Sequence, residues 1–370
     1  MHLEWLELRD FRSYQWLRFE PSDGINVLIG RNGAGKTNVL EAVGYLSQLK
    51  SFRRTPDAAL IRAGAEKAIA RGGFRDGGST TDIAVEIPKA GRRQVLVNGK
   101  RPVRLSDVAT AAPVVAFLPD DLDLVKRGPV LRREFVDDLG AQLIPTVGAD
   151  QREFDKALRQ RNTLLKQEGR NADPMTLDVW DARLAETGGR VLANRLRLLG
   201  RLCDSLSEAY RTVGGERNES LLPIYRSSWI DVGQIVPGMD PDRESLATQL
   251  LAAVERRRSR DLETRSTSVG PHRDDPGFSL NGRDVRVQAS QGEQRSVALS
   301  LRIGAYQLLE ERHGRPPMLL LDDVFSELDP SRADGVTALL PRGQVFVTSA
   351  RDDEVPKMGR RWRVVGGVIE

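Results

Sequence analysis

The eight residues Gly30 to Thr37 constrain the fold of this chain more than any other stretch. They read Gly-Arg-Asn-Gly-Ala-Gly-Lys-Thr and fit the pattern G-x-x-x-x-G-K-[ST], the phosphate-binding P-loop. An apolar segment typical of a buried strand, residues 25–29, precedes the loop, and a segment with helical periodicity, residues 38–50, follows it. A strand, a glycine-rich loop and a helix in this order predict an α/β fold with a nucleoside-triphosphate site.

The residue types in the loop each have a physical reason. Glycines let the backbone curl so that its N–H groups point into one concavity, and the helix that follows adds the positive end of its dipole. Lys36 is expected to reach the β- and γ-phosphates, and the Thr37 hydroxyl is expected to ligate Mg²⁺. The predicted nucleotide-binding residues of this segment are Gly30, Arg31, Asn32, Gly33, Ala34, Gly35, Lys36, Thr37 and Asn38.

Length and composition limit the remaining classes. A chain of 370 residues suggests about two domains, and a net charge of +4 permits an anionic partner without requiring one. Cys203 is the only cysteine, which excludes an internal disulfide, and the three histidines are scattered along the chain. The N-terminal residues lack the apolar core of a signal peptide, and no apolar run approaches ~20 residues. We therefore expect a soluble, cytoplasmic protein.

The secondary-structure signals change character twice. Strand and turn patterns dominate residues 1–118, long helical patterns dominate residues 119–267, and short strands return in residues 268–370. The chain is therefore predicted to be an α/β ATPase domain of mixed sheets and helices, interrupted by a mainly helical inserted domain. One long helix is expected from residue 174 to about residue 213, and the pair Gly188-Gly189 is expected to bend or interrupt it.

A basic segment follows the P-loop helix. Lys50, Arg53 and Arg54 lie just past the predicted nucleotide site. They fit either a loop that faces DNA or a solvated helix end whose cations complement the helix dipole, and the second interpretation is favoured.

The C-terminal third carries the remaining site motifs. Ser290-x-x-Glu293 has the form of a capping box, and Ser290-x-Gly292 at a helix start is also a phosphate-binding device. The apolar strand at residues 318–321 ends in Asp322 and Asp323, the Walker B pattern. Asp322 is expected to hold Mg²⁺, and Asp323 to orient or deprotonate the attacking water. Together with Lys36 these are the predicted catalytic residues.

Two further elements complete the predicted site. Asp329 and Pro330 form an N-cap and N1 pair for a helix over residues 331–340. The strand at residues 344–349 ends in polar residues, so a sensor of the γ-phosphate is expected there, at Thr348.

The order of these motifs resembles that of the ATP-binding-cassette ATPases. The resemblance implies that the Ser-x-Gly helix of one subunit completes the P-loop of another, so that two ATP molecules are sandwiched in a head-to-tail dimer. It also implies that Asp329 lies at the nucleotide. Transport ATPases usually have Glu where this chain has Asp323, and His where it has Thr348-Ser349. These departures, and the long insertion between the P-loop and Ser290, favour the branch that acts in DNA repair and chromosome maintenance.

Within that branch the chain resembles the bacterial RecF family. The resemblance rests on Phe11-Arg12-Ser13-Tyr14, Asn38-Val39-Leu40-Glu41-Ala42, Ser51-Phe52-Arg53, Gly128-Pro129-x-x-Arg132-Arg133-x-Phe135, Gly270-Pro271-His272-Arg273-Asp274-Asp275, Ser290-x-Gly292-x-Gln294-Arg295 and Leu321-Asp322-Asp323-Val324-x-Ser326-Glu327-Leu328-Asp329, besides the P-loop. Glu293 departs from the Gln expected there and adds negative charge near the sandwiched phosphate.

The RecF resemblance implies a function and partners. It implies an ATP-dependent homodimer that binds double-stranded and gapped DNA, assists RecA loading with RecR and RecO, and hydrolyses ATP slowly as a switch. The wider branch implies that Arg12 and Ser13 touch the nucleotide. Two alternatives stay open from the residues alone: a membrane-transport ATPase subunit, and a scaffold for RecR that does not hydrolyse ATP.

Overall fold

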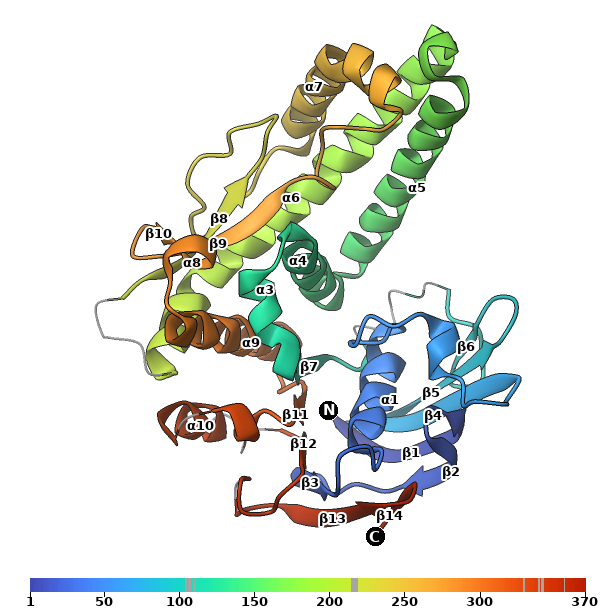
Figure 1. The fold of residues 1–370 in the computed structure, drawn as a ribbon, viewed down its shortest axis with the longest axis vertical. Coiled ribbons are helices and arrows are strands. Elements are labelled where there is room, and N and C mark those ends of the chain that lie inside the picture. Colours follow the sequence, from blue (N-terminus) through green and yellow to red (C-terminus); the bar gives the residue numbers. More distant parts are fainter. Residues whose placement is uncertain are drawn as a thin grey trace. The chain divides into compact units, whose positions relative to one another are not determined.

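The computed structural model describes residues 1–103, 105, 108, 111–213, 219–328, 330–338, 340, 343–355 and 357–370. The chain divides into two compact units (Figure 1). The first unit contains Met1–Asp121, Thr212–Gly214 and Leu301–Glu370, and the second contains Leu122–Arg211 and Gly215–Ser300. The mixed α/β class predicted from the sequence is confirmed.

A five-stranded antiparallel sheet begins the first unit. Its strand order is β2-β1-β4-β5-β6. The strands are β1 (His2–Phe11), β2 (Tyr14–Phe19), β4 (Lys67–Asp76), β5 (Ser79–Pro88) and β6 (Gln94–Val97). Leu6 and Leu8 of β1 point to the buried face while Glu7 and Arg9 lie on the other face, as the two-residue period of a strand requires. The strand and turn patterns of residues 1–118 thus form this sheet, in which all neighbouring strands are antiparallel.

The second sheet of this unit holds the P-loop strand. Its order is β14-β13-β3-β12-β11-β7, and all pairs except β13 with β14 are parallel. The strands are β3 (Ile25–Ile29), β7 (Val114–Phe117), β11 (Met318–Asp322), β12 (Val345–Ser349), β13 (Arg360–Val365) and β14 (Val368–Ile369). Strands β7, β11 and β12 are buried along their whole length, which is typical of a parallel sheet covered on both faces.

Helix α1 (Lys36–Gln48) belongs to the core of the first unit. Its residues from Val39 to Ser47 are all buried, and its apolar side chains join one hydrophobic cluster with those of both sheets. A helix that is buried on all sides is expected at the centre of a domain. The remaining helical elements here are η1 (Asp57–Leu60), η2 (Pro119–Asp121), η4 (Phe325–Glu327), α10 (Pro330–Thr337) and the C-terminal part of α9 (Gln291–His313).

The second unit is mainly helical. Its elements are α3 (Leu122–Lys126), α4 (Pro129–Leu143), α5 (Pro145–Glu168), η3 (Gly169–Asn171), α6 (Pro174–Thr212), α7 (Arg243–Thr264), α8 (Val285–Gln288) and the strands β8 (Leu221–Arg226), β9 (Asp275–Leu280) and β10 (Arg283–Asp284). The units divide after Asp121 and after Ser300, whereas the predicted boundaries lay after residues 118 and 267. The second difference arises because β9 pairs with β8 and so packs inside the helical unit.

The pair Gly188-Gly189 does not interrupt α6, which is one continuous helix of 39 residues. Because the glycines have no side chains, α7 can pack closely against α6 at this point. A Cβ atom on Gly189 would lie 2.8 Å from the Ala247 nitrogen and 2.9 Å from the Arg243 carbonyl oxygen. Both of these atoms are backbone, so the neighbouring helix cannot yield by rotating a side chain. The expected interruption at this position is therefore wrong, and the long helix predicted from residue 174 is confirmed.

Gly189→Ala is expected to lower the free energy of unfolding by about 1–3 kcal/mol, because overpacking against a backbone outweighs the better helix propensity of alanine. Thermal or urea unfolding followed by circular dichroism measures this change. Gly78→Ala is the control, since nothing lies within 4 Å of a Cβ at that position. Equal stability of the Gly189→Ala variant and the parent would contradict the packing argument.

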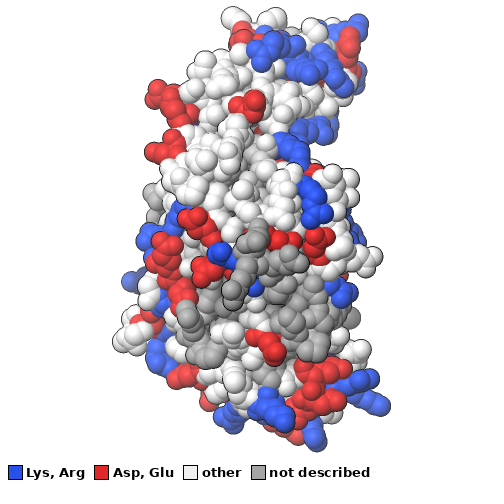
Figure 2. Space-filling model, turned by 90° about the vertical axis from the view of Figure 1, so that its left-hand side faces the viewer, with Lys and Arg blue, Asp and Glu red and all other residues white. Residues whose placement is uncertain are grey.

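Charge is unevenly distributed on the second unit. In Figure 2, Lys and Arg side chains gather at the end of this unit that carries α7 and the C-terminal end of α5. The exposed cations of these segments are Lys166, Arg170, Arg256, Arg257, Arg260 and Arg265.

Among the helices of the described residues, none is both long and apolar enough to cross a membrane.

Candidate nucleotide-binding site

The P-loop runs from the end of β3 to the start of α1, as predicted. Gly33 and Gly35 have φ angles of 81° and 111°, a region that favours glycine. A Cβ atom on Gly35 would also lie 2.8 Å from the Tyr14 hydroxyl. A Cβ on Gly30 would lie 2.4 Å from the Val364 carbonyl oxygen of β13. The glycines are therefore required both by the backbone conformation and by the close neighbours of the loop.

Lys36 places its ammonium group at the loop. Its Nζ donates hydrogen bonds to the carbonyl oxygens of Gly30 at 2.7 Å and Arg31 at 3.2 Å. Burial lowers the pKa of Lys36, while the negative charges of Asp323 and Asp322 raise it. A cation held by two backbone carbonyls beside N–H groups of a curled loop is positioned to meet an oxyanion.

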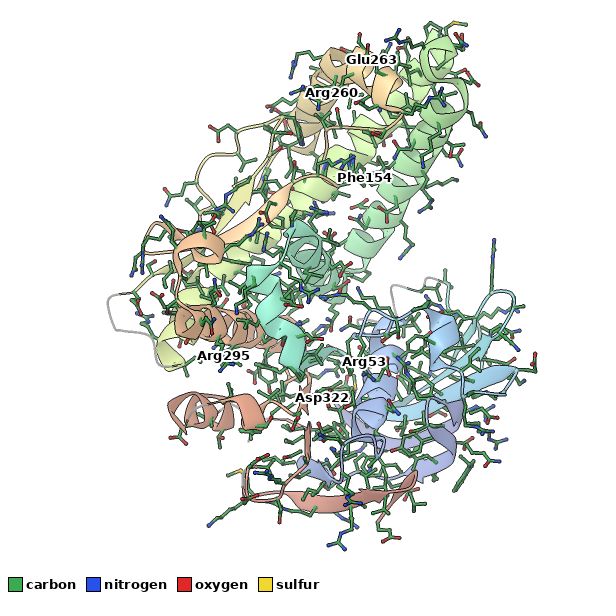
Figure 3. The ribbon with its side chains drawn as sticks, viewed as in Figure 1. Arg53, Phe154, Arg260, Glu263, Arg295 and Asp322 are labelled. Atoms are coloured by element: carbon green, nitrogen blue, oxygen red, sulfur yellow. The ribbon has the colours of Figure 1, made fainter. Side chains whose placement is uncertain are left out.

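Asp322 lies where two strands and the P-loop helix meet. In the parallel register of β11 and β12, Asp322 pairs with Thr348. Asp322 Oδ1 accepts hydrogen bonds from Thr37 Oγ1 at 2.8 Å and Thr348 Oγ1 at 2.7 Å. Figure 3 labels Asp322 among the side chains of this unit. The hydroxyl and carboxylate predicted to ligate Mg²⁺ are thus adjacent, which is the oxygen-rich donor set that this ion prefers.

Asp323 is held in a conformation that is uncommon for a residue with a side chain. Its φ is +52°, and its N–H donates to the carbonyl oxygen of Thr348 at 3.2 Å and to Thr348 Oγ1 at 3.0 Å. Its Oδ1 atom is buried and has no hydrogen-bond partner among the described residues. A buried acceptor without a hydrogen-bond donor is uncommon, and a water molecule bound beside a nucleotide would supply a donor to this oxygen.

The pKa of Asp323 is raised above its usual value. Burial is the largest cause, Lys36 acts in the opposite direction, and Asp322 adds to the increase. A carboxylate with a raised pKa accepts a proton more readily than an exposed one. The oxygen donors of Thr37 and Asp322, the unpaired oxygen of Asp323 and the geometry of the P-loop together fit ATP and Mg²⁺.

Thr348, the residue expected to sense the γ-phosphate, is engaged by protein groups, and its contact with the nucleotide stays a prediction. Its side chain is 1% exposed, and its hydroxyl donates to Asp322 while accepting from the Asp323 N–H. The hydroxyl thus holds the Asp322 carboxylate and the backbone of Asp323 at the end of β11. A role as a positioning residue fits these contacts better than direct contact with the nucleotide.

Thr348→Val, which keeps the shape but removes the hydroxyl, is expected to lower kcat for ATP hydrolysis on the order of tenfold, since one hydrogen bond to a charged group is worth about 1.5–3 kcal/mol. KM for ATP should change little, because Lys36 and the loop backbone are untouched. Thr348→Ser keeps the hydroxyl and should restore kcat. Steady-state kinetics on the three proteins test this, and an increase in KM alone would instead support direct contact with ATP.

Arg12 is engaged with protein groups. Its guanidinium donates to both carboxylate oxygens of Glu41, at 2.8 and 2.7 Å, and to Thr55 Oγ1 at 2.7 Å and the Ala59 carbonyl oxygen at 2.8 Å. Glu41 is fully buried. Sequence reasoning assigned no role to Glu41, although it lies in one of the quoted motifs. The contact of Arg12 with nucleotide stays a prediction.

Ser13 and Asn38 lie next to the loop. Asn38 Nδ2 donates to Ser13 Oγ at 2.9 Å, and Ser13 Oγ would lie 3.0 Å from a Cβ on Gly35. Both predicted nucleotide-binding residues therefore belong to the same polar cluster. Of the other loop residues, Arg31 and Asn32 are exposed, and Ala34 is half-buried.

The basic segment after α1 lies on the surface of the first unit. The helix ends at Gln48, and Leu49 forms its C-cap with φ of 55°. Lys50, Arg53 and Arg54 are exposed, and Arg53 is labelled in Figure 3. The structure is consistent with both interpretations of this segment, and DNA contact by these residues stays a prediction.

The Ser-x-Gly helix begins in the second unit. The Ser290 N–H donates to Glu293 Oε2 at 2.6 Å, and the Glu293 N–H donates to Ser290 Oγ at 3.3 Å. The capping box is therefore confirmed. Hydrogen bonds from Ser290 hold the pKa of Glu293 below its usual value, so Glu293 is anionic at neutral pH. Gly292 is half-buried beside it, and Asp329 lies outside the described residues.

Comparisons with known proteins agree with these motifs. A sequence model of the RecF/RecN/SMC N-terminal domain matches residues 2–367. The chain is similar to the DNA replication and repair protein RecF of Acidothermus cellulolyticus, with 40% identity over 98% of both chains, and of Streptomyces avermitilis, with 38% identity over 100% of both. It is also similar to a solved structure of the recombination mediator protein RecF with ATP in the RecFOR pathway. That match has a TM-score of 0.91 and 30% identity, and covers 100% of this chain and 97% of the other.

Proposed function

Because the chain belongs to the RecF family of the RecF/RecN/SMC proteins, we propose that it is an ATP-dependent DNA-binding protein of recombinational repair that uses ATP and Mg²⁺. The observation that carries this proposal is the cluster at Asp322. A carboxylate that joins the P-loop threonine to the neighbouring strand, with Lys36 and the unpaired Asp323 oxygen beside it, is built for a triphosphate.

The chemistry of the site follows from the chain's own groups. The Lys36 ammonium and the loop N–H groups stabilise negative charge on the β- and γ-phosphate oxygens. Thr37 and Asp322 would hold Mg²⁺, which would supply further neutralisation of those oxygens. Asp323 orients the attacking water and accepts its proton through Oδ1, while the Thr348 hydroxyl holds the Asp322 carboxylate and the Asp323 backbone N–H in place. The hydrolysis is expected to be slow and to act as a switch.

The active form is proposed to be an ATP-dependent homodimer. The chain has one P-loop and one Ser-x-Gly helix, and the helix start at Ser290 offers N–H groups and the positive dipole end to an anion. We infer that Ser290 and Gly292 of one protomer, with Glu293 and Asp329, complete the P-loop site of the other. Loss of the γ-phosphate removes the charge that joins the halves and loosens the dimer.

The proposed partners are those that the resemblance to the RecF family implies. We infer binding to double-stranded and gapped DNA, and cooperation with RecR and RecO in assisting RecA loading at single-strand gaps. The proposed location is the cytoplasm.

Sedimentation velocity with and without ATP and Mg²⁺, and with duplex, gapped and single-stranded DNA, tests the proposal. The expected result is a monomer without ATP, a dimer with ATP, and a faster-sedimenting complex when duplex or gapped DNA is added with ATP. ATP-independent sedimentation and no DNA complex under any condition would overturn it. Co-purification with an integral membrane protein in that case would favour a transport ATPase subunit.

A further inference from the structure

Helix α5 carries a row of basic side chains on one face. The row consists of Arg152, Lys156, Arg159 and Lys166, which we call the basic stripe. At 3.6 residues per turn these positions fall within an arc of about 80°. All four are exposed. The buried residues of the helix, among them Phe154 and Leu165, lie on the opposite side, and Figure 3 labels Phe154 on the inner side of α5. The stripe therefore faces solvent within its unit.

The stripe differs from the other arginines of the helical unit in its ion pairing. On α6, Arg183 and Arg190 pair with Glu153 at 3.0 and 2.7 Å, and Arg195 pairs with Asp137 at 2.7 Å. By contrast, no described carboxylate lies within 4.0 Å of a charged nitrogen of the stripe.

The acids of α5 itself compensate the stripe only in part. Asp155, which lies beside the stripe, is half-buried and accepts a hydrogen bond from Gln151 at 3.0 Å. Its charge also attracts Arg159, but the two side chains form no ion pair within 4.0 Å. Glu153 is engaged by α6. The positive charge of the stripe is thus available to an external anion.

The length and composition of the stripe indicate the kind of anion. Fourteen residues separate its ends, about 21 Å at 1.5 Å per residue, and duplex DNA carries one negative charge per ~1.7 Å of its axis. Arginine also suits bidentate contact with phosphate. The only aromatic residue of α5, Phe154, is fully buried, so the helix offers no base-stacking surface of the kind that single-strand binders use.

We propose that the basic stripe of α5 binds the phosphate backbone of duplex DNA without reading its sequence. The inference rests on the proposed function, because it names the surface through which the ATP-bound protein holds DNA. It adds a second region to Lys50, Arg53 and Arg54, which lie in the other unit.

The test is the salt dependence of duplex binding in the presence of ATP and Mg²⁺. Replacing Arg152, Lys156 and Arg159 together by Gln removes three phosphate contacts for each stripe that engages the duplex. The slope of log K against log salt should then fall by roughly 2.7, since each contact contributes about 0.9. Affinity at 100 mM salt should fall on the order of hundredfold or more. Fluorescence anisotropy with a labelled duplex of arbitrary sequence measures both quantities.

A matched control removes the same charge elsewhere. Replacing Arg92, Lys100 and Arg101 by Gln changes exposed cations of the first unit and should leave the slope unchanged. A charge-conserving variant, Arg152→Lys with Arg159→Lys, should keep most of the slope.

Equal slopes for the stripe variant and the parent would overturn the proposal. So would a variant that keeps duplex affinity but loses binding to an acidic protein partner. If the parent protein binds no duplex in the presence of ATP, the result overturns the proposed function as well as the proposal for the stripe. ATP-induced dimerisation of the stripe variant shows that it is folded.

Discussion

Asp323→Asn is expected to lower the rate of ATP hydrolysis by about 10²–10⁴-fold, because an amide cannot accept the proton of the attacking water. Binding of ATP should persist, since Lys36, Thr37 and Asp322 are unchanged. The variant should therefore accumulate as an ATP-bound dimer that stays on DNA. Single-turnover hydrolysis and sedimentation with ATP measure the two effects.

The pH dependence of ATP hydrolysis by the parent protein also tests the role of Asp323. Burial raises the pKa of Asp323 above the ordinary value of 3.8. As pH rises through this raised value the carboxylate loses its proton and becomes a base, so hydrolysis should increase with pH through that range. In Asp323→Asn the hydrolysis rate should no longer fall at acidic pH. In the control Asp353→Asn, which changes an exposed acid, that fall should remain. A fall that persists in Asp323→Asn would contradict the assignment of the base.

Lys36→Met is expected to abolish ATP-induced dimerisation and to weaken ATP binding on the order of ten- to hundredfold, the effect of losing a charged hydrogen bond worth about 1.5–3 kcal/mol. Methionine keeps the buried stem and removes the ammonium that lies over the carbonyls of Gly30 and Arg31. Equilibrium binding of a fluorescent ATP analogue and sedimentation with ATP measure the two losses.

Lys67→Met is the matched control for this variant. Lys67 is an exposed lysine of β4 that pairs with Glu86 at 3.1 Å, so its loss should change neither measurement. A Lys36→Met protein that dimerises with ATP and binds DNA as the parent does would disprove the ATP-gated dimer.

The sequence predicted the parts of the site that are marked by short motifs. The P-loop, the two carboxylates after an apolar strand, and the capping box at Ser290 each occupy a few consecutive residues. Their local geometry depends mainly on glycine conformations, strand burial and backbone hydrogen bonds at a helix end. The helix over residues 243–264 was also predictable, because its N-cap Asp242 accepts a hydrogen bond from the Glu244 N–H as a capping residue should.

Strand β13 shows where the sequence signal was too weak. Its residues begin Arg-Arg-Trp-Arg, and only Val364 within it is buried, so neither an apolar run nor a clean alternation marks it. It nevertheless pairs in parallel with the P-loop strand β3. Its backbone at Val364 is one reason why residue 30 is glycine.

Local motifs were enough to predict the chemistry of the site: a P-loop lysine and threonine, two Walker B carboxylates, and a capped helix suited to an anion. Which of these groups come into contact depends on how distant segments of the chain pack together. Thr37 and Asp322 are 285 residues apart. The Thr348 hydroxyl meets the Asp322 carboxylate and the Asp323 N–H because β12 pairs in register with β11. Contacts at such separation depend on sheet order and packing, which no local pattern encodes. The same holds for Gly189, whose missing side chain matters only because α7 packs against it.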